Sequence, residues 1–328
     1  MKILIIHTYG LGDMIMFTPA LQYLMNKYPN AKIDFLIFQK MAAEPIRNCK
    51  YIHNIYYSDN SAINISRTII KLRGNRYDIS IVTSGGKPLK ASLFSFLAGA
   101  KERIGEYAKY PILFYTKNIK YQEKLHRVEN NILLVEDNLN NISAPLFCSD
   151  NSLNPKKYKN ETILIGIHPG SNAKFKTKRW QKEYFVKLIN LINNKYDCKI
   201  LLFAGPDELE ESKYIASNSN VELVVNKSLQ EVASLISDCN IFINTDSGLG
   251  HIASCYDIEI FTIFGPAKDY KIQPYSSKAN AIKLNLECQP CYGTERIKSC
   301  KEFKCLSNLT PIQVFTEIKN RSKVLSHG

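Results

Sequence analysis

Short runs of consecutive branched apolar residues alternate along the chain with stretches in which apolar residues recur at helical spacing. Uninterrupted apolar runs are typical of parallel strands that are buried on both faces. In the first half such runs fall at residues 2–7, 32–38, 51–56 and 78–82. Helix-spaced stretches lie between them at residues 19–28, 41–49, 63–72 and 88–98. This alternation predicts a doubly wound parallel sheet.

The same alternation restarts in the second half, after an aperiodic segment at residues 138–160 that is rich in Asn, Ser and Pro. Such clusters are typical of linkers. Strands are predicted at residues 162–168, 198–203, 221–224, 240–244 and 259–264, and helices at 181–195, 207–217, 229–237, 250–256 and 310–323. We therefore expect an α/β protein of two lobes, residues 1–150 and 151–328. Doubly wound sheets bind ligands where their strands end, so we expect a cleft between the lobes at those ends.

The charge balance is strongly positive, with 43 Lys and Arg against 30 Asp and Glu and a formal charge of +13. This surplus suits a nucleotide, an acidic lipid surface or nucleic acid, and it equally suits a lysine-rich composition with no special partner. The longest apolar stretches, such as residues 91–100, are about half as long as a membrane-spanning helix. The opening apolar run is too short for a signal peptide, so we expect a cytoplasmic protein.

The loop after the first predicted strand reads Thr8-Tyr9-Gly10-Leu11-Gly12-Asp13. Glycines let a backbone pass close to a ligand. Ile15, however, stands where the dinucleotide-binding fingerprint has its third glycine, so support for a nicotinamide cofactor is weak. Asp13 lies just beyond a strand end and suits the removal of a proton from a hydroxyl group. Aspartate also caps helices, and the motif alone supports the two roles equally.

Two loops of the second half carry residue types that bind anions. His168-Pro169-Gly170-Ser171 is followed by Lys174, Lys176, Lys178 and Arg179, which suit a diphosphate or form an exposed basic loop in which Trp180 anchors the next helix. The segment Asn244-Thr245-Asp246-Ser247-Gly248-Leu249-Gly250-His251 opens a helix after a buried strand. Backbone N–H groups there suit phosphate, and the spacing places Asp246, Ser247 and His251 toward one ligand. The turns at residues 203–208 and 264–267 are predicted to be structural.

Four of the nine cysteines lie near the end of the chain, at Cys288, Cys291, Cys300 and Cys305. The first pair has a spacing typical of zinc ligands. Structural zinc, free thiols and paired disulfides are all compatible with the pattern. Because the cluster is far in sequence from the loops described above, we assign it no catalytic role.

Taken together, these motifs resemble glycosyltransferase family 9, the ADP-heptose:lipopolysaccharide heptosyltransferases. The similarity runs in order through nearly the whole chain: Gly12-Asp13, Thr18-Pro19-Ala20-Leu21, Arg103-Ile104-Gly105, His126-Arg127-Val128-Glu129-Asn130, the turn at residues 168–171, Lys178-Arg179-Trp180, residues 246–253, Phe264-Gly265-Pro266 and Cys305-Leu306. The chain departs from the family pattern at Gln181, Ile258-Glu259 and Ala267. The last of these touches the donor side and leaves the donor sugar open.

The resemblance implies a GT-B fold with two Rossmann-like lobes, the first for the acceptor and the second for the nucleotide sugar. It implies inverting, metal-independent transfer of heptose from ADP-heptose to the lipopolysaccharide or lipooligosaccharide core. Asp13 would be the general base, and donor contacts would come from Gly12, Ser171, Lys178, Asp246, Ser247, Gly248 and His251. The last helix is a candidate for packing back on the first lobe. No Asp-x-Asp occurs in the chain, which favours cationic assistance without a required cofactor.

Residues 101–127 mix seven Lys and Arg with four tyrosines, which suits a phosphorylated glycolipid or a membrane interface and equally a solvated basic surface. Candidate acceptor contacts are Arg103, Lys109 and Lys120, and we expect peripheral association with the inner face of the inner membrane. Other functions stay open: transfer of another nucleotide sugar to a surface glycan, nucleotide-sugar epimerisation, or non-catalytic binding of a nucleotide or glycan. Only charge favours nucleic acid, with no recognition motif behind it.

Overall fold

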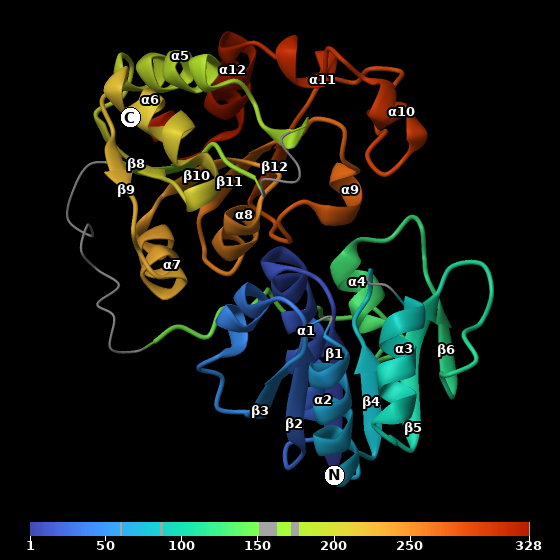
Figure 1. Cartoon of the computed structure of the whole chain (residues 1–328). Helices are drawn as coiled ribbons and strands as arrows, with labels where there is room; N and C mark the ends of the chain where they lie inside the picture. The colour runs from blue at the N-terminus through green and yellow to red at the C-terminus, as the bar shows by residue number, and fades with distance from the viewer. Residues whose placement is uncertain (60, 86–87, 151–162, 172–176, 328) are drawn as a thin grey trace. The chain divides into compact units, whose positions relative to one another are not determined.

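The computed structural model describes residues 1–59, 61–85, 88–150, 163–171 and 177–327. The chain divides into two compact units, Met1–Cys148 and Ser149–Gly328, which we call unit 1 and unit 2 (Figure 1). This division falls two residues before the predicted lobe boundary. Two predicted ligand contacts, Lys174 and Lys176, lie outside the described residues, as does the first residue of the strand predicted from position 162.

Unit 1 contains one six-stranded parallel sheet in the order β3-β2-β1-β4-β5-β6. The strands are β1 (Lys2–His7), β2 (Lys32–Ile37), β3 (Ile52–Tyr57), β4 (Ile79–Val82), β5 (Glu102–Tyr107) and β6 (Lys117–Lys120). The helices are α1 (Leu11–Lys27), α2 (Ala62–Gly74), α3 (Pro88–Leu97) and α4 (Arg127–Ile132), with a 3-10 helix η1 at Lys40–Ile46. The predicted parallel sheet is thus confirmed.

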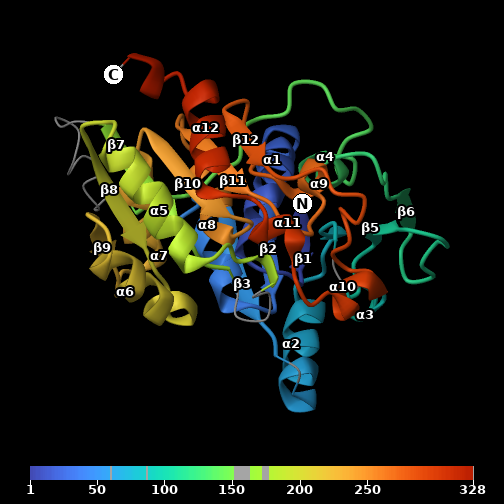
Figure 2. The ribbon, with the colours of Figure 1, turned by 90° about the horizontal axis from the view of Figure 1, so that it is seen from above.

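Alternation along β1 explains the layers of unit 1. Ile3 and Ile5 enter the core beneath α1, η1 and α4, whereas Leu4 and Ile6 enter the core beneath α2 and α3. Figure 2 shows the sheet with α1 and α4 on one side and α2 and α3 side by side on the other. Both faces of β1 are therefore buried, as its uninterrupted apolar run requires.

Unit 2 repeats this topology in its own six-stranded parallel sheet, β12-β11-β10-β7-β8-β9. Its strands are β7 (Ile163–His168), β8 (Cys198–Phe203), β9 (Glu222–Val224), β10 (Ile241–Thr245), β11 (Glu259–Ile263) and β12 (Ala279–Ile282). Its helices are α5 (Lys182–Asn193), α6 (Leu209–Ser217), α7 (Leu229–Asp238), α8 (Gly248–Ala253), α9 (Asp269–Ile272), α10 (Glu295–Ser299), α11 (Lys304–Ser307) and α12 (Pro311–Arg321), with 3-10 helices η3 (Pro206–Glu208) and η4 (Leu325–His327). Counted within each unit, the first strand again lies at the centre beside the fourth.

The last long helix, α12, packs against α5 within unit 2. Val314, Phe315 and Ile318 of α12 join the same buried cluster as Phe185 and Leu188 of α5. Thr310 caps α12 by accepting a hydrogen bond from the Gln313 backbone, as the sequence predicts. The helix therefore belongs to the core of unit 2, and that packing accounts for its apolar face.

The predicted elements differ from the observed ones at α1, at residues 41–49, where the predicted helix is the 3-10 helix η1, at the short helices α4, α9, α10 and α11, and at three strands. The first helix begins at Leu11, eight residues before its predicted start at Pro19. The proline, expected at the beginning of the helix, lies inside it. The strands β5 (ERIGEY), β6 (KNIK) and β12 (ANAI) were not predicted, since none has the uninterrupted run of branched apolar residues found in the central strands. Among the described residues, no helix combines the length and apolar character needed to span a bilayer.

Candidate functional site

Asp13 lies in the first turn of α1, directly after β1, and remains partly exposed. The residue that caps this helix is Gly10, so Asp13 is inside the helix and does not have the capping position. Its Oδ1 atom lies 3.4 Å from Nη1 of Arg127. The carboxylate is thus held beside a guanidinium whose charge balances its own.

Arg127 reaches Asp13 because the loop after β4 leaves room for it. Its Nη1 also donates to the Ser84 carbonyl at 3.2 Å. Gly85 has a φ of +94°, and a Cβ atom at this position would lie 1.2 Å from Nη1 of Arg127. Glycine is therefore required at position 85 for two independent reasons, backbone conformation and the close approach of Arg127.

The Ser84–Gly85 loop is fixed from two sides. Asn131 of α4 accepts a hydrogen bond from the Ser84 backbone N–H at 2.8 Å and donates to the Met16 carbonyl of α1 at 3.2 Å. Glu106 of β5 accepts from the Ser84 hydroxyl at 2.5 Å and from the Gly85 backbone N–H at 2.6 Å. These bonds tie α1, α4 and the loop into one rigid frame around Asp13.

His7, the last residue of β1, is fully buried beneath this frame. Its Nε2 lies 3.2 Å from the Gly10 carbonyl, and its Nδ1 lies 2.9 Å from the Thr83 hydroxyl. Burial lowers the pKa of His7 to about 4, opposed by the hydrogen bond to the Gly10 backbone and assisted by the charge of Arg127. Since a carbonyl only accepts, the neutral ring donates from Nε2 and accepts from Thr83 at Nδ1.

In unit 2, the loop preceding α5 and the loop after β10 meet at an ion pair. Lys178 Nζ lies 2.7 Å from Oδ2 of Asp246, and both side chains are largely buried. The ammonium group also lies 4.3 Å from the centre of the Tyr292 ring. The ammonium group is thus held in place between a carboxylate and an aromatic face.

The last residue of β7, His168, connects two further loops. Its Nδ1 lies 2.9 Å from the Ser247 hydroxyl, and its Nε2 lies 2.9 Å from Oε1 of the buried Glu208. Burial works to raise the pKa of Glu208, but the hydrogen bonds from His168 and the Gly205 backbone and the charges of His168 and Arg179 outweigh it and lower the pKa. The ionised Glu208 therefore orients the imidazole, which in turn orients Ser247.

Close backbone approaches bring Ser171 into the same region. A Cβ atom at Gly170 would lie 2.4 Å from Cδ of Glu208, so only glycine fits there. The Gly170 carbonyl accepts from the Thr245 hydroxyl at 2.6 Å, and the Ser171 carbonyl accepts from Arg179 at 2.7 Å. The loops after β7, β8 and β10 are thus locked together at the carboxyl ends of their strands.

The structure brings most of the predicted donor residues together in unit 2. Ser171 follows β7, Asp246 and Ser247 follow β10, and Gly248 and His251 lie in α8. Gly12 belongs to unit 1, where it lies in the first turn of α1 beside Asp13. Their ligand contacts remain predictions.

Sequence reasoning missed the polar partners that hold these residues. His7, Glu106 and Arg127 fix the Asp13 region, and Glu208 was assigned to a structural turn although it contacts His168. A glutamate and a histidine placed directly after buried strands were the available signal.

Comparison with known proteins decides the family. The sequence matches glycosyltransferase family 9 (heptosyltransferase) over residues 65–302, which is more than half of the chain. The chain belongs to this family. It is 27% identical to lipooligosaccharide heptosyltransferase 2 of Campylobacter jejuni over 98% of this chain and 99% of that protein. It is also 27% identical to lipopolysaccharide heptosyltransferase 2 of Salmonella typhimurium over 87% of this chain and 88% of that protein.

Solved structures of similar proteins share the fold. The structure of Escherichia coli ADP-heptose LPS heptosyltransferase II superposes with a TM-score of 0.79 at 21% identity, covering 100% of this chain and 99% of that one. An E. coli heptosyltransferase solved with ADP-2-deoxy-2-fluoro heptose gives a TM-score of 0.74 at 20% identity, with 98% and 100% coverage. The predicted GT-B architecture is confirmed, and the chain is a family 9 glycosyltransferase.

The candidate acceptor contacts of this family 9 chain are spread over the far strands of unit 1. Arg103 is the second residue of β5, near the end opposite to the strand ends that adjoin Asp13. Its guanidinium is engaged by the Phe114 and Ala100 carbonyls at 2.7 and 2.8 Å. Lys109 and Lys120 are exposed on the loop after β5 and at the end of β6. Arg103 therefore has a structural role in joining β5 to the following loop.

The four C-terminal cysteines lie close enough to influence one another. Burial raises the pKa of Cys305 to about 11, and charges on Cys291, Cys288 and Cys300 contribute. Burial likewise raises the pKa of Cys291, with contributions from Cys288 and Cys300. Within the described residues, no group of three or more His, Cys, Asp or Glu has a geometry that could hold a metal.

The cysteine segment nevertheless adjoins the candidate site, which its position in the sequence did not indicate. The backbone N–H groups of Cys291 and Tyr292 both donate to the Pro266 carbonyl, at 3.0 and 2.9 Å. The Tyr292 ring lies against Lys178. The segment thus forms one wall beside the buried cation.

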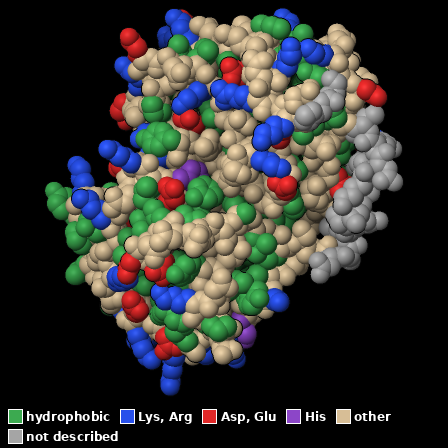
Figure 3. Space-filling model, turned by 180° about the vertical axis from the view of Figure 1, so that it is seen from behind, with side chains coloured by type: hydrophobic (Ala, Val, Ile, Leu, Met, Phe, Trp, Pro, Cys, Tyr) green, Lys and Arg blue, Asp and Glu red, His purple; other side chains and the backbone are tan. Residues whose placement is uncertain are grey.

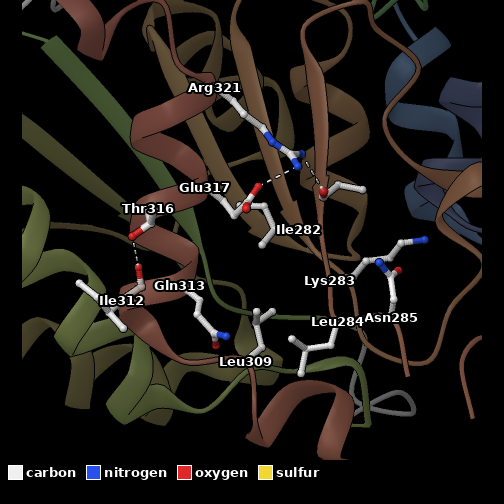
Figure 4. A pocket seen from close by; sticks show the side chains of 11 residues that line it. Ile282, Lys283, Leu284, Asn285, Leu309, Ile312, Gln313, Thr316, Glu317 and Arg321 are labelled. Carbon is white, nitrogen blue, oxygen red and sulfur yellow. Dashed lines mark hydrogen bonds and ion pairs between the residues drawn. The ribbon is translucent and has the colours of Figure 1, made fainter. Parts of the chain in front are cut away.

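A separate cavity of about 450 Å³ lies between β12 and α12 (Figure 4). Arg321 closes one end, paired with Glu317 at 2.7 Å and donating to the Ala281 carbonyl at 3.3 Å. None of the predicted donor residues lines it. The cavity is therefore distinct from the site built around Lys178 and Ser247.

Proposed function

We propose that this chain is an inverting heptosyltransferase that moves heptose from ADP-heptose to the core of a lipopolysaccharide or lipooligosaccharide. The observation that carries the proposal is the end-to-end similarity to a protein named lipooligosaccharide heptosyltransferase 2. A buried lysine near the strand ends of unit 2 and a carboxylate at a strand end in unit 1 support it.

Asp13 is the proposed general base. A sugar hydroxyl is a weak nucleophile near neutral pH, and a carboxylate that removes its proton as the new bond forms accelerates the step by about 10²–10⁴-fold. Attack on the anomeric carbon from the face opposite the nucleotide breaks the bond to the diphosphate and inverts the configuration. Arg127 is the proposed positioning residue, since it orients the carboxylate while leaving it partly exposed.

Lys178 and Ser247 are the proposed contacts of the donor diphosphate. The leaving diphosphate gains negative charge in the transition state, and a buried ammonium group stabilises that charge more than an exposed one would. Asp246 holds Lys178 in place and, with His251, is proposed to contact the nucleotide or sugar hydroxyls. Ser171 and Gly248 are proposed to approach the same ligand from the loop after β7 and the start of α8, and Gly12 from unit 1.

Transfer is proposed to need no metal ion. The sequence has no Asp-x-Asp pair, and the carboxylate best placed near the donor, Asp246, is engaged by Lys178. Among the described residues the four cysteines form no metal site, and we propose that they take no part in transfer. Metal analysis of protein purified without chelators tests the three states that the sequence leaves open: about one zinc per chain, lost in Cys288→Ser/Cys291→Ser, would show a structural zinc site, and none would show free or paired thiols.

The function is tested by offering the purified protein ADP-heptose, UDP-GlcNAc and GDP-mannose with heptose-deficient lipooligosaccharide and a chelator. We expect transfer from ADP-heptose alone, detected as the mass increase of one heptose, with an inverted anomeric configuration by NMR. Lys178→Met should weaken ADP binding by about 100-fold, since it removes a charge-assisted contact and leaves Asp246 buried without its cation.

Two outcomes would redirect the assignment. Transfer from UDP-GlcNAc or GDP-mannose in place of ADP-heptose would favour a surface glycan transferase. Tight nucleotide binding without transfer to any acceptor would favour a binding protein. The double variant Lys178→Met/Asp246→Asn is the matched control, because it removes both charges and should regain fold stability without regaining ADP affinity.

A further inference from the structure

The outward face of α3 is apolar where a solvent-facing helix is normally polar. Ala91, Phe94 and Ala98 point into the core of unit 1, so the opposite side of the helix faces outward. That side carries Leu89, Leu93 and Phe96, at helical spacings of four and three, and all three are exposed. Leu89 is 66% exposed. Such a stripe needs a partner, because isolated exposed leucines are common but aligned ones are not.

The segment between β5 and β6 extends this face. Phe114 packs on Phe96 of α3, with ring centres 5.4 Å apart, and so joins the segment to the helix. From the same segment Tyr110 is strongly exposed and Leu113 is 91% exposed. We call Leu89, Leu93, Phe96, Tyr110 and Leu113 the apolar face.

Exposed lysines adjoin the part of the apolar face that lies between β5 and β6. Lys109 precedes Tyr110, and Lys120 ends β6; both are exposed, and neither has a carboxylate within 4.0 Å among the residues that the structure describes. Lys90 of α3 lies 5.3 Å from the centre of the Phe38 ring. Figure 3 shows hydrophobic and basic side chains together at its left edge, over the segment between β5 and β6. Apolar side chains with flanking lysines match the chemistry of an anionic membrane surface.

Unit 2 offers no comparable surface. Of the fifteen large apolar side chains that are exposed among the described residues, twelve belong to unit 1 and three to unit 2. The three in unit 2 are Tyr214 of α6, Tyr270 of α9 and Ile312 of α12. The apolar face is therefore a local feature of unit 1 and not a general property of the surface.

We propose that the apolar face docks unit 1 on an anionic lipid bilayer. This inference rests on the proposed function, because the proposed acceptor is a glycolipid. Leucine and phenylalanine side chains enter the headgroup region, Tyr110 lies at its boundary, and the lysines contact lipid phosphates. The helix α3 follows the Ser84–Gly85 loop that holds Arg127 beside Asp13. Docking through α3 therefore brings the membrane close to the proposed base, where the sugars of a lipid-anchored acceptor are presented.

Sedimentation with vesicles tests this surface directly. Full-length protein is mixed with vesicles of phosphatidylethanolamine and phosphatidylglycerol, or of phosphatidylcholine alone. We expect binding to the anionic vesicles that is weakened by salt, and at least about tenfold weaker binding by Leu89→Glu/Leu113→Glu. The matched control is Tyr214→Glu/Ile312→Glu, which makes the same charge change on exposed apolar residues of unit 2 and should bind as the wild type does.

Vesicle binding requires no transfer, so it fails or succeeds independently of the proposed function. If heptose transfer is also observed, Leu89→Glu/Leu113→Glu should retain it on a de-acylated, water-soluble acceptor and lose it on an acceptor embedded in vesicles. Equal binding by wild type and variant, or no binding to anionic vesicles, would overturn the docking surface. A wild-type dimer in solution that the variant converts to monomer would assign the face to a second copy of the chain instead.

Discussion

The two units end their first strands in the same way, with a buried histidine. His7 ends β1 and His168 ends β7, and the two strands hold equivalent central places in sheets of identical topology. Each ring places Nδ1 2.9 Å from a hydroxyl that follows the fourth strand of its unit, Thr83 in one case and Ser247 in the other. The two histidines differ in the partner of Nε2.

In unit 1 that partner is the Gly10 carbonyl, and in unit 2 it is the carboxylate of Glu208. A carbonyl gives no charge to stabilise a cation, and burial leaves His7 neutral with a pKa of about 4. The ionised carboxylate of Glu208 accepts from Nε2 of His168, so Nδ1 is left to accept from the Ser247 hydroxyl. One scaffold thus yields a support held by a backbone carbonyl beside the proposed base and a support held by a buried carboxylate beside the proposed donor site.

The largest expected effect is the loss of unfolding free energy in acid, and it comes from His7 in unit 1. The pKa of His7 is about 4 in the folded state and 6.5 in the unfolded chain, so the unfolded chain takes up a proton first. The stability that depends on a neutral His7 is fully present above pH 6.5 and is lost as the pH falls toward 4. The loss in unfolding free energy is about 3 kcal/mol. In His7→Gln, which keeps a donor to the Gly10 carbonyl, this part of the change of unfolding free energy with pH should disappear. Urea unfolding between pH 7 and 4 measures it.

An unchanged slope in His7→Gln would show that the buried ring does not govern the acid response of unit 1. His53→Gln is the control, because His53 is an exposed histidine of β3 whose ring lies outside this core. The control should keep most of the wild-type slope.

A smaller effect is expected from adding a side-chain atom next to Glu208, which orients His168 in unit 2. Gly170→Ala places a Cβ atom against Glu208, at 2.4 Å from its Cδ, and we expect a loss of about 2 kcal/mol in unfolding free energy. ADP affinity should fall with it, since Glu208 can no longer hold His168. Gly74→Ala is the control, because no atom lies within 4 Å of a Cβ at that position. Thermal unfolding with and without ADP separates the two effects, and a wild-type melting curve for Gly170→Ala would contradict the close packing.

The smallest effect separates the two nitrogens of His168. Asparagine retains a polar group near the Nδ1 position, and glutamine retains one near the Nε2 position. If His168 acts by orienting Ser247, His168→Gln should weaken ADP binding by about tenfold, and His168→Asn by about threefold or less. Isothermal titration measures both. Equal losses, or the reverse order, would make the contact with Glu208 the important one.

Much of this architecture could be predicted from the chain, and the limits have physical causes. The apolar runs of β1 and β7 predicted both sheets because central parallel strands are buried on both faces. The edge strand β6, with the sequence KNIK, carries no such pattern because one side of it faces solvent. Apolar runs therefore predict the strands that carry them, including the edge strands β3 and β9, and miss the strands of mixed sequence, β5, β6 and β12.

The candidate site likewise contains residues that the sequence predicted and residues that it did not. Asp13 and Asp246 stood out because each follows an apolar strand in a glycine-containing loop, and Lys178 because it lies among cations after the first strand of the second half. Arg127 and Glu208 did not, since their importance lies in contacts 114 and 40 residues away in sequence, with Asp13 and His168. The role of Tyr292 beside Lys178 was hidden for the same reason. Long-range partners of this kind leave no local pattern.

The most direct test of the account compares heptose transfer by the wild type and Asp13→Asn under single-turnover conditions. Asparagine keeps the size of the side chain and an oxygen for Arg127 but cannot accept the proton. We predict a rate about 10³-fold lower with ADP-heptose affinity unchanged within about twofold. Transfer within tenfold of the wild-type rate would show that Asp13 is not the base. Loss of donor binding together with transfer would show that Asp13 acts on the donor instead.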